Sequence, residues 1–326
     1  MLYDNFNRIH NYLRISITDK CNFRCSYCMP EECYTFTPSE RLMNAAEIES
    51  IAREFVSLGI NKLRLTGGEP LLRKDFADIL TRLSKLNIEL LITTNGLLLN
   101  QYIDTIKAAK VSTINVSLDS LNPETFFQIT KRNAFKQVWD NIMLLLQEGI
   151  RVKINVVAIK EFITKEIFDF LELTKNLPLH IRFIEFMPFA GNNWTSDDVV
   201  TAAQLLKLVS EKHNIVKLID EPHATARKYK VVGYEGTFAF ITTMTNQFCG
   251  DCNRVRLTAD GKLKNCLFSR EETDLLTPFR KNEPIVPLIV ETVKRKYPAL
   301  GGQFQPDYQT IQPQVLINRS MIGIGG

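Results

Sequence analysis

The sequence predicts an α/β protein whose main sheet is an open, partial barrel or a doubly wound sheet, followed by a smaller C-terminal region. Apolar, β-branched runs alternate with amphipathic stretches over the first two thirds of the chain. This alternation is typical of parallel strands covered by helices, and about six units are too few for the eight of a closed barrel. Beyond about residue 215 hairpin patterns replace the alternation, so we predict two domains, residues 1–215 and 216–326.

The predicted strands are short apolar and β-branched runs, as buried strands require, at residues 13–18, 62–66, 90–94, 113–119, 152–159 and 181–187. The predicted helices carry apolar residues at three- and four-residue spacing, at residues 45–58, 75–86, 101–109, 135–148, 165–176 and 201–213. Residues 228–232 and 237–241 flank a Gly-containing turn and predict one hairpin. Residues 255–258 and 262–267 predict another, because they flank the turn signal Asp260-Gly261.

Composition and charge exclude several classes of protein. The chain has 326 residues, and its 40 basic and 36 acidic side chains leave a net charge of +4, too mild to predict nucleic-acid binding. No run reaches the roughly 18 apolar residues of a membrane span, and residues 1–5 lack the basic and apolar regions of a signal peptide. We therefore expect a cytoplasmic protein without nucleic-acid or membrane partners. An odd number of cysteines, seven, argues against a disulfide framework.

Polar or Gly-containing motifs follow five of the predicted strands. They are the loop around Cys21, Thr66-Gly67-Gly68-Glu69-Pro70, Thr93-Thr94-Asn95-Gly96, Ser117-Leu118-Asp119-Ser120 and Glu185-Phe186-Met187-Pro188. In partial barrels and doubly wound sheets the C-terminal ends of the strands share one face, where ligands bind. One such motif is an ordinary turn, but five at the same face predict a shared ligand site.

Cys21, Cys25 and Cys28 form the most specific chemical motif, directly after the first predicted strand. Three thiolates can hold a four-iron cluster and leave one iron without a protein ligand, and an open metal position is where chemistry takes place. A structural zinc site needs four ligands, and the nearest further candidate is Cys33. An iron–sulfur cluster with one open iron is therefore the preferred interpretation.

The second cysteine group consists of Cys249, Cys252 and Cys266. Taken alone, it fits a zinc ribbon completed by His223 or Cys33, but two incomplete groups in one chain favour two iron–sulfur clusters. Arg254 and Arg256 follow on one face of a strand, where guanidinium groups suit phosphate. Without the neighbouring cysteines, these arginines would be read as ordinary surface ion pairs.

The first cysteine motif and the glycines after the second strand resemble the radical S-adenosylmethionine (SAM) superfamily. Within it, the second cysteine group, Asn253-Arg254-Val255-Arg256 and the terminal Gly325-Gly326 resemble the GTP 3′,8-cyclase family of molybdenum cofactor biosynthesis. The resemblance covers nearly the whole chain. It implies an incomplete (β/α)6 barrel of radical SAM type, with a smaller C-terminal α+β region that closes the barrel.

The resemblance implies a SAM site at the first cysteine group. Cys21, Cys25 and Cys28 would hold a [4Fe–4S] cluster whose open iron binds the amino and carboxylate groups of SAM. An electron from that cluster would cleave SAM to methionine and a 5′-deoxyadenosyl radical, which is chemistry that belongs to the cofactor. The remaining SAM contacts would be Tyr27, Gly68, Ser117 and Met187.

The resemblance also implies a GTP site at the second group. A second [4Fe–4S] cluster on its three cysteines, Cys249, Cys252 and Cys266, would present its open iron to guanine. The radical would abstract hydrogen from ribose C3′, and the ribose radical would attack guanine C8 to give 3′,8-cyclo-7,8-dihydro-GTP. The catalytic residues would include Arg14, Gly325 and Gly326, although terminal glycines are ordinarily a frayed tail. The residues in contact with GTP would be Arg14, Arg64, Thr93, Lys153, Arg182, Arg254 and Arg256.

The implied partners are an electron donor such as flavodoxin or ferredoxin, and a cyclic pyranopterin monophosphate synthase that takes the product. The oligomeric state stays open, with a homodimer among the permitted states. Two alternatives remain: a radical SAM enzyme that modifies a peptide with the help of an auxiliary cluster, and a zinc-stabilised binding protein. The sequence assigns no role to Cys33 or to residues 274–298.

Overall fold

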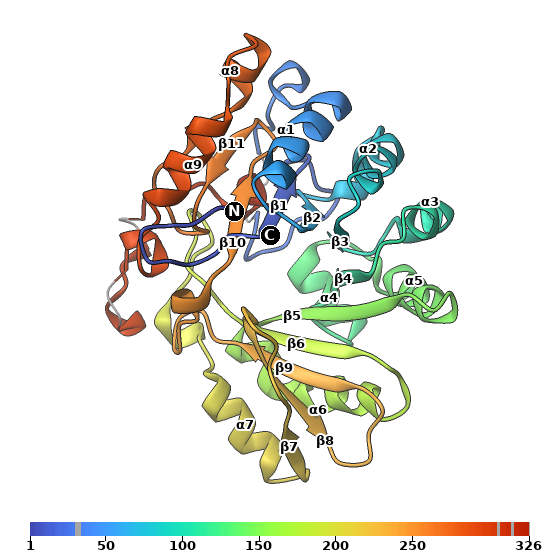
Figure 1. Cartoon of the computed structure of the whole chain (residues 1–326). Helices are drawn as coiled ribbons and strands as arrows, with labels where there is room; N and C mark the ends of the chain where they lie inside the picture. The colour runs from blue at the N-terminus through green and yellow to red at the C-terminus, as the bar shows by residue number, and fades with distance from the viewer. Residues whose placement is uncertain (30–33, 305–306, 314–315, 326) are drawn as a thin grey trace.

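The computed structural model describes residues 1–29, 34–304, 307–313 and 316–325 (Figure 1). The strands are β1 (Tyr12–Ser16), β2 (Lys62–Thr66), β3 (Glu89–Thr94), β4 (Thr113–Ser117), β5 (Arg151–Ala158), β6 (His180–Glu185), β7 (Ile215–Lys217), β8 (Ala226–Val231), β9 (Thr237–Ile241), β10 (Arg254–Leu257), β11 (Lys262–Lys264) and β12 (Thr273–Asp274). The helices are α1 (Ala45–Ser57), α2 (Phe76–Ser84), α3 (Ile103–Ala108), α4 (Pro123–Thr130), α5 (Phe135–Gln147), α6 (Lys160–Asn176), α7 (Ala202–Ser210), α8 (Leu276–Arg280), α9 (Val286–Lys294) and α10 (Met321–Ile324).

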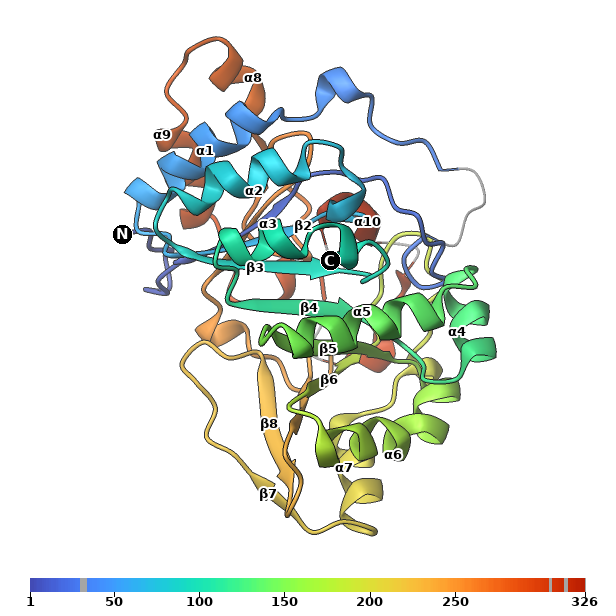
Figure 2. The same cartoon turned by 90° about the vertical axis from the view of Figure 1, so that its right-hand side faces the viewer.

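Strands β1 to β6 pair in parallel, each with the next along the chain, and confirm the predicted partial barrel. Helices α1, α2, α3 and α5 lie against the outer side of this curved sheet, as Figure 2 shows. Apolar residues of the strands and the helices, among them Leu13, Ile51, Leu65, Ile92 and Phe170, form one continuous core between the two layers. Burial of the outer strand face leaves the inner face for polar side chains.

The C-terminal strands lengthen this sheet at both edges. β9 pairs in parallel with β6, and β10 pairs in parallel with β1. The predicted hairpins are β8–β9 and β10–β11, both antiparallel. The sheet order runs from β12 to β7, and within the described ranges no hydrogen bonds join these two end strands. The barrel therefore stays open, and the C-terminal region covers its interior with loops and α10.

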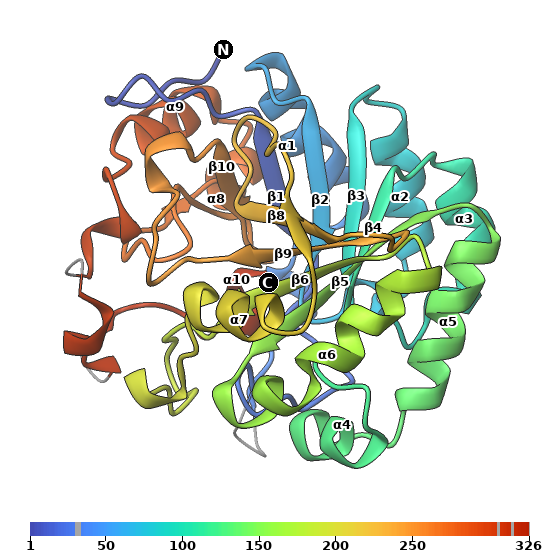
Figure 3. The ribbon, with the colours of Figure 1, turned by 90° about the horizontal axis from the view of Figure 1, so that it is seen from below.

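Three helical regions were absent from the sequence prediction: α4, the region of α8 and α9, and α10. α4 begins at Pro123, and the side chain of Asn122 caps it by accepting from two backbone N–H groups. The 274–298 segment, which carried no motif, contains α8 and α9. Short α10 lies near the centre of the molecule, seen from below in Figure 3. No helix in the described part of the chain combines the length and the apolar character needed to cross a bilayer.

Candidate active site

Two adjoining cavities occupy the inner side of the sheet; the first lies at the C-terminal ends of the strands, and the second is lined by side chains from within the strands. The lining of the first cavity includes Cys21, Cys25, Tyr27, Cys28, Gly68, Thr93, Asn95, Ser117 and Asp119. The lining of the second cavity includes Arg14, Asn115, Arg182, Cys249, Cys252, Arg254, Arg256 and Cys266. Asn155, Ile184, Met187 and Met321 line both. The two cysteine groups, distant in sequence, therefore border neighbouring parts of one interior.

The loop that carries the first cysteine group is held by backbone hydrogen bonds. Arg24 N donates to Thr130 O at 2.9 Å and Ser26 N donates to Ile129 O at 3.0 Å, so the C-terminal end of α4 supports the loop. A Cβ atom at Gly68 would collide with the carbonyl oxygen of Lys20. Glycine at this position lets the turn after β2 pack directly on the cysteine loop.

One buried carboxyl group, Asp119, lines the first cavity, and another, Glu69, lies next to its lining residue Gly68. Glu69 accepts from Thr94 Oγ1 and Asn95 N, both at 2.7 Å, and burial raises its pKa to about 7. Asp119 accepts from Tyr27 Oη at 2.7 Å and Val157 N at 2.8 Å, and burial raises its pKa to about 6.

The thiols of the first cavity are affected by the same burial. Burial, with a smaller contribution from Glu69, raises the pKa of Cys21 to about 11. Burial likewise raises the pKa of Cys28 to about 12 and that of Cys25 well above its ordinary value. A positive charge bound in the first cavity would stabilise the ionised forms of these acids.

Buried cations surround the second cavity. Arg14 on β1 lies in register with Arg256 on β10 and with Arg64 on β2. Burial and then the neighbouring arginines lower the pKa of Arg14 well below its ordinary value, that of Arg256 to about 10 and that of Arg182 to about 9. The Nε atoms of Arg182 and Arg254 are buried and have no hydrogen-bond partner among the described residues. An anion bound between these groups would offset both their burial and their mutual repulsion.

Three of the predicted GTP contacts lie outside the second cavity. Arg64 Nε donates to Tyr12 Oη at 2.5 Å, and its Nη1 donates to Ile92 O at 2.9 Å and Thr93 Oγ1 at 3.2 Å. Thr93 borders the first cavity. Lys153 lies near Arg182 and Arg64, and burial together with these two cations lowers its pKa to about 8. Arg64 and Lys153 thus extend the cationic group beyond the lining of the second cavity.

The second cysteine group is supported by residues far away in sequence. Arg8 Nη1 donates to Cys249 O at 2.7 Å. Lys296, just beyond α9, places its Nζ 3.4 Å from Cys252 Sγ and donates to Arg254 O at 2.9 Å. Burial raises the pKa of the Cys252 thiol, but Arg254 and Lys296 outweigh burial and lower it to about 6.

Both cysteine groups fit iron–sulfur ligation by their surroundings. Cys21 Sγ accepts from Phe23 N at 3.4 Å, and Cys252 Sγ accepts from Lys296 Nζ at 3.4 Å and Arg254 Nη2 at 3.7 Å. Hydrogen bonds to sulfur of this kind tune iron–sulfur centres. In the described part of the chain, no three His, Cys, Asp or Glu side chains converge on a single metal ion.

Two additional zinc ligands were considered for the cysteine groups. His223 lies beside the second group, because its Nδ1 is 2.7 Å from Oδ1 of Asp251, which lies between Cys249 and Cys252, but this imidazole is engaged with that carboxylate. Since no three potential ligands converge among the described residues, this contact gives no support to a zinc site completed by His223. Cys33 lies outside the described residues.

The C-terminal tail reaches the second cavity. Gly325 O accepts from Arg256 Nη1 at 2.6 Å, and Ile322 and Ile324 are buried. Gly325 has φ of 85°, and a Cβ atom there would collide with Thr66 Oγ1, so only glycine suits this position. Gly326 lies outside the described residues. The tail is therefore docked rather than frayed up to Gly325.

Sequence reasoning missed two amides in the cavities, although a signal was present. Asn115 lies between Thr93 and Lys153 in the register of β3, β4 and β5. Asn155 follows Lys153 by two residues on β5, and alternate residues of a strand share one face. Asn115 Oδ1 is buried and lacks a partner among the described residues, and Asn155 Oδ1 accepts from Arg182 Nη2. Alternation from Lys153 on β5 and from Ser117 on β4 would have identified both.

Comparisons with known proteins agree with this architecture. The radical SAM superfamily profile matches residues 15–174, and a profile described as Molybdenum Cofactor Synthesis C matches residues 179–300. The chain is 42% identical to the mitochondrial GTP 3′,8-cyclase of Arabidopsis thaliana, over 100% of this chain and 84% of the relative. It is 38% identical to GTP 3′,8-cyclase of Desulforamulus reducens, over 90% of this chain and 94% of the relative.

Longer relatives and solved structures extend the comparison. Human molybdenum cofactor biosynthesis protein 1 is 41% identical over 97% of this chain, which spans only 51% of that relative. Streptococcus suis SuiB superposes with a TM-score of 0.63 over 91% of this chain and 68% of its own, at 16% identity. The structure of SuiB bound to S-adenosylmethionine superposes with a TM-score of 0.61 over 88% of this chain and 68% of its own, at 15% identity. These two likenesses concern the fold alone.

Proposed function

The chain belongs to the GTP 3′,8-cyclase family of radical SAM enzymes, and from this membership we propose how its two cavities divide the reaction. The enzyme acts at the first step of molybdenum cofactor biosynthesis, on GTP, with SAM and an iron–sulfur cluster. We assign SAM to the first cavity and GTP to the second. The observation that carries this assignment is the gathering of four arginines in the lining of the second cavity, whereas among the described residues the lining of the first has the carboxyl group of Asp119 and no arginine.

The first cavity suits SAM because SAM carries a sulfonium cation. Cys21, Cys25 and Cys28 would hold a [4Fe–4S] cluster, which together with SAM supplies a 5′-deoxyadenosyl radical when both are bound. Asp119 lines this cavity and Glu69 lies nearby; burial raises the pKa of both carboxyl groups, and a bound cation would favour their ionised forms. Tyr27, Gly68, Ser117 and Met187 line the same cavity, and we propose that they position the adenosyl and methionine parts.

The second cavity suits GTP because a triphosphate carries several negative charges. Guanidinium groups bind phosphate in a bidentate manner, and four arginines line this cavity, namely Arg14, Arg182, Arg254 and Arg256. Arg64 and Lys153 add positive charge beside them. We propose a second [4Fe–4S] cluster on Cys249, Cys252 and Cys266, which would bind guanine, with Thr93 at the junction toward the first cavity.

The shared wall places the two ligands next to each other. Ribose C3′ of GTP would lie near Asn155, Ile184 and Met187, which border both cavities, so that the radical takes its hydrogen and the ribose then attacks guanine C8. Fixed juxtaposition of reacting groups supplies a large part of the rate. We propose that Arg14, Gly325 and Gly326 complete this site and that the tail excludes water.

Two partners follow from the chemistry. Each turnover needs two electrons that the chain does not generate: one cleaves SAM, and the second, with a proton, reduces the nucleotide radical that remains after the ribose attacks guanine C8. We propose that a carrier such as flavodoxin or ferredoxin reduces the first cluster and that a reductant of the same kind supplies the second electron. The cyclised nucleotide is a reactive intermediate, and we propose that cyclic pyranopterin monophosphate synthase takes it. Both assignments rest on the pathway of the family to which the chain belongs.

Anaerobic incubation with GTP, SAM and a reductant tests the proposed function. We expect 5′-deoxyadenosine to form in a GTP-dependent manner, and GTP deuterated at C3′ to transfer deuterium into it. SAM cleavage that ignores GTP but depends on a peptide would contradict the assignment and favour the peptide-modifying alternative. A colourless, zinc-containing protein after anaerobic purification would favour the binding protein.

A further inference from the structure

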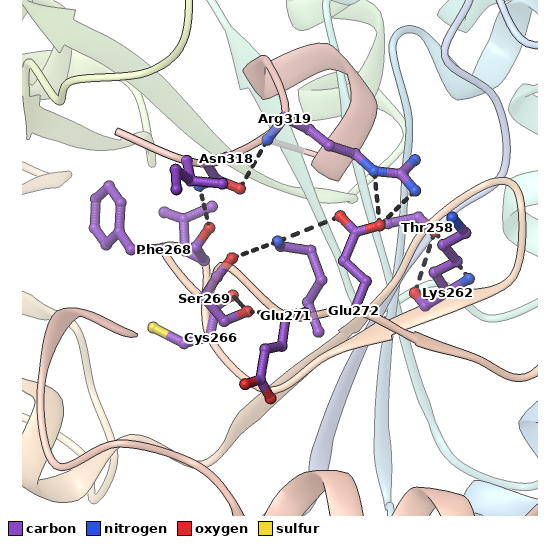
Figure 4. A network of polar contacts seen from close by, with 12 residues as sticks. Thr258, Lys262, Cys266, Phe268, Ser269, Glu271, Glu272, Asn318 and Arg319 are labelled. Carbon is purple, nitrogen blue, oxygen red and sulfur yellow. Dashed lines mark hydrogen bonds and ion pairs between the residues drawn. The ribbon is translucent and has the colours of Figure 1, made fainter. Parts of the chain in front are cut away.

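The base of the C-terminal tail is fastened by Arg319. Its Nη1 and Nη2 donate to the two oxygens of Asp260, at 2.9 Å and 3.0 Å. Its Nε and Nη2 donate to Glu272 Oε2, at 2.9 Å and 2.5 Å, and Figure 4 shows this pair. One planar guanidinium thus holds two carboxylates, which lysine cannot reproduce because it lacks the fork of donors.

This ion-pair group is largely shielded from solvent. The side chains of Arg319, Asp260 and Glu272 are 28%, 10% and 14% exposed. Burial raises the pKa of Asp260, but the hydrogen bonds from Arg319 outweigh it and hold that pKa below its ordinary value. Shielded, bidentate pairs contribute more than the isolated surface pairs whose effect is close to nothing. Arg319 is therefore suited to hold a segment in place.

The same group is joined to the loop of the second cysteine group. Glu272 also lies 3.4 Å from Lys264 Nζ, and this lysine donates to Ser269 O at 2.7 Å. Beside Arg319, Asn318 Nδ2 donates to Leu267 O at 2.9 Å, and both contacts are visible in Figure 4. Arg319 of the tail base and Lys264 of β11 thus share Glu272 as an acceptor, and Lys264 also holds the loop after Cys266 through Ser269 O.

Beyond Arg319 few polar contacts hold the tail. Ser320 Oγ lies 2.9 Å from Tyr34 Oη, and Gly325 O accepts from Arg256 Nη1. Between these two points Ile322 and Ile324 are buried, and α10 is only four residues long. A helix this short has little stability of its own. Its position depends on its two ends, and Arg319 holds the end that lies outside the cavities.

We propose that Arg319, gripped by Asp260 and Glu272, is a positioning residue that fastens the tail to the second cysteine loop and so delivers Gly325 to Arg256. The docking of the tail is a property of the fold, whereas its effect on turnover rests on the proposed function. Arg319 lies outside the lining of both cavities. Its loss should therefore reduce the turnover number through the tail and leave nucleotide affinity nearly unchanged.

Hydrogen exchange and kinetics of Arg319→Gln in the full chain test this proposal. We expect amides of residues 316–325 to exchange at least about tenfold faster than in the wild type, because local opening sets their exchange. Peptides from β1 to β6 should exchange as before. The GTP-dependent turnover number should fall by about 10- to 100-fold, since small misplacements of a reacting site have effects of this order, while the Kd for GTP changes by less than about threefold.

Three variants sharpen the result. Arg280→Gln is the matched control, because Arg280 Nε and Nη2 grip Glu47 at 2.7 Å and 3.1 Å on the outer surface, and it should leave tail exchange and turnover unchanged. Arg319→Lys keeps the positive charge but loses the planar arrangement of donors. Its tail exchange rate and its turnover number should lie between those of the wild type and of Arg319→Gln. If Arg319→Gln unfolds, Asp260→Asn must still accelerate exchange selectively in the tail.

The proposal is overturned if tail exchange in the folded variants equals that of the wild type, or if the tail loosens while turnover is unchanged. A wild-type enzyme that cleaves SAM without regard to GTP would instead contradict the proposed function. In that case the exchange measurement still decides whether Arg319 fastens the tail.

Discussion

The two cavities differ in their buried ionisable groups although they share a wall. Around the first, buried Glu69 and Asp119 have raised pKa values, as do the three thiols. Around the second, buried arginines have lowered pKa values, and the pKa of Cys252 falls to about 6. Burial disfavours the charged form in both sets, which are acids around the first cavity and mainly arginines around the second. A bound cation would therefore favour the ionised acids of the first cavity, and a bound anion would favour the charged arginines of the second.

The two cysteine groups also differ in how the chain builds them. The first lies in one short loop after β1, and the C-terminal end of α4 supports that loop through backbone hydrogen bonds from Arg24 N and Ser26 N. The second combines the turn at residues 249–252 with Cys266, and receives support from Arg8 near the N-terminus and Lys296 after α9. The cysteines of the first group are thus close together in sequence, whereas those of the second come from two separate segments, and tertiary contacts support both groups.

Removing one cysteine thiol from each group should have the largest effect and should distinguish the functions of the two cavities. Cys28→Ser should lower SAM cleavage by more than about 10³-fold, because radical formation needs the first cluster. Cys252→Ser should retain SAM binding but lose product formation. Each variant should fall from about eight irons per chain to about four, as measured by iron analysis and EPR. Loss of all iron in either variant would contradict two independent sites.

Single charge changes should affect one ligand each. Arg256→Ala should weaken GTP binding by about 100-fold, since a buried charged contact is worth a few kcal/mol, and leave SAM affinity within about threefold. Asp119→Asn should show the reverse preference, with weaker SAM binding and little change for GTP. Isothermal titration under anaerobic conditions measures both. Equal losses of affinity for GTP and SAM in either variant would contradict the assignment of each ligand to one cavity by charge.

Lys296 tests the tertiary support of the second cysteine group. Lys296→Met keeps much of the side-chain volume but removes a positive charge and an N–H···S hydrogen bond. We expect second-site iron to be lost to a chelator about tenfold faster, and the reduction potential of that cluster to fall because its reduced form loses a stabilising cation. Lys294→Met, on exposed α9 surface, is the control. If the EPR signal and the rate of iron loss to the chelator were the same as in the wild type, Lys296 would contribute packing but no electrostatic support to the cluster.

The pH dependence of GTP affinity should be the smallest effect. Burial and neighbouring cations lower the pKa of free Lys153 to about 8, and a bound triphosphate would raise it again. The contribution of Lys153 to affinity is then fully present below about pH 8 and is lost as pH rises through the pKa of the bound state, by at most about tenfold per pH unit. Fluorescence titration with GTP between pH 7.5 and 9 measures this affinity. If the affinity of Lys153→Met depended on pH as steeply as that of the wild type, the titrating group would be a residue other than Lys153.

Local pattern was enough to predict parallel strands covered by helices, both hairpins and the cysteine groups, whereas the choice of a partial barrel over a doubly wound sheet came from the family resemblance. The six strands and the first cysteine loop follow from runs of residues adjacent in the chain. The joining of β9 to β6 and of β10 to β1 did not follow, because a hairpin pattern does not say which edge of a sheet it meets. That joining is what brings Arg254 and Arg256 beside Arg14.

The unpredicted parts of the site come from long-range contacts. Lys296 and Arg8 reach the second cysteine group only after the chain has folded, and nothing in their local sequence indicates it. α4, by contrast, was signalled by Asn122 and Pro123, a capping residue followed by proline in the first turn. Asn155 could have been placed by strand alternation from Lys153. Of these residues, only Lys296 and Arg8 could therefore not have been assigned to the site without the structure.

EPR of the anaerobic, reduced protein with each ligand tests the central claim most directly. The account predicts two cluster signals, of which SAM alters the one that Cys28→Ser lacks and GTP alters the one that Cys252→Ser lacks. A single cluster signal, or two ligands that perturb the same signal, would contradict the assignment of SAM and GTP to separate cavities.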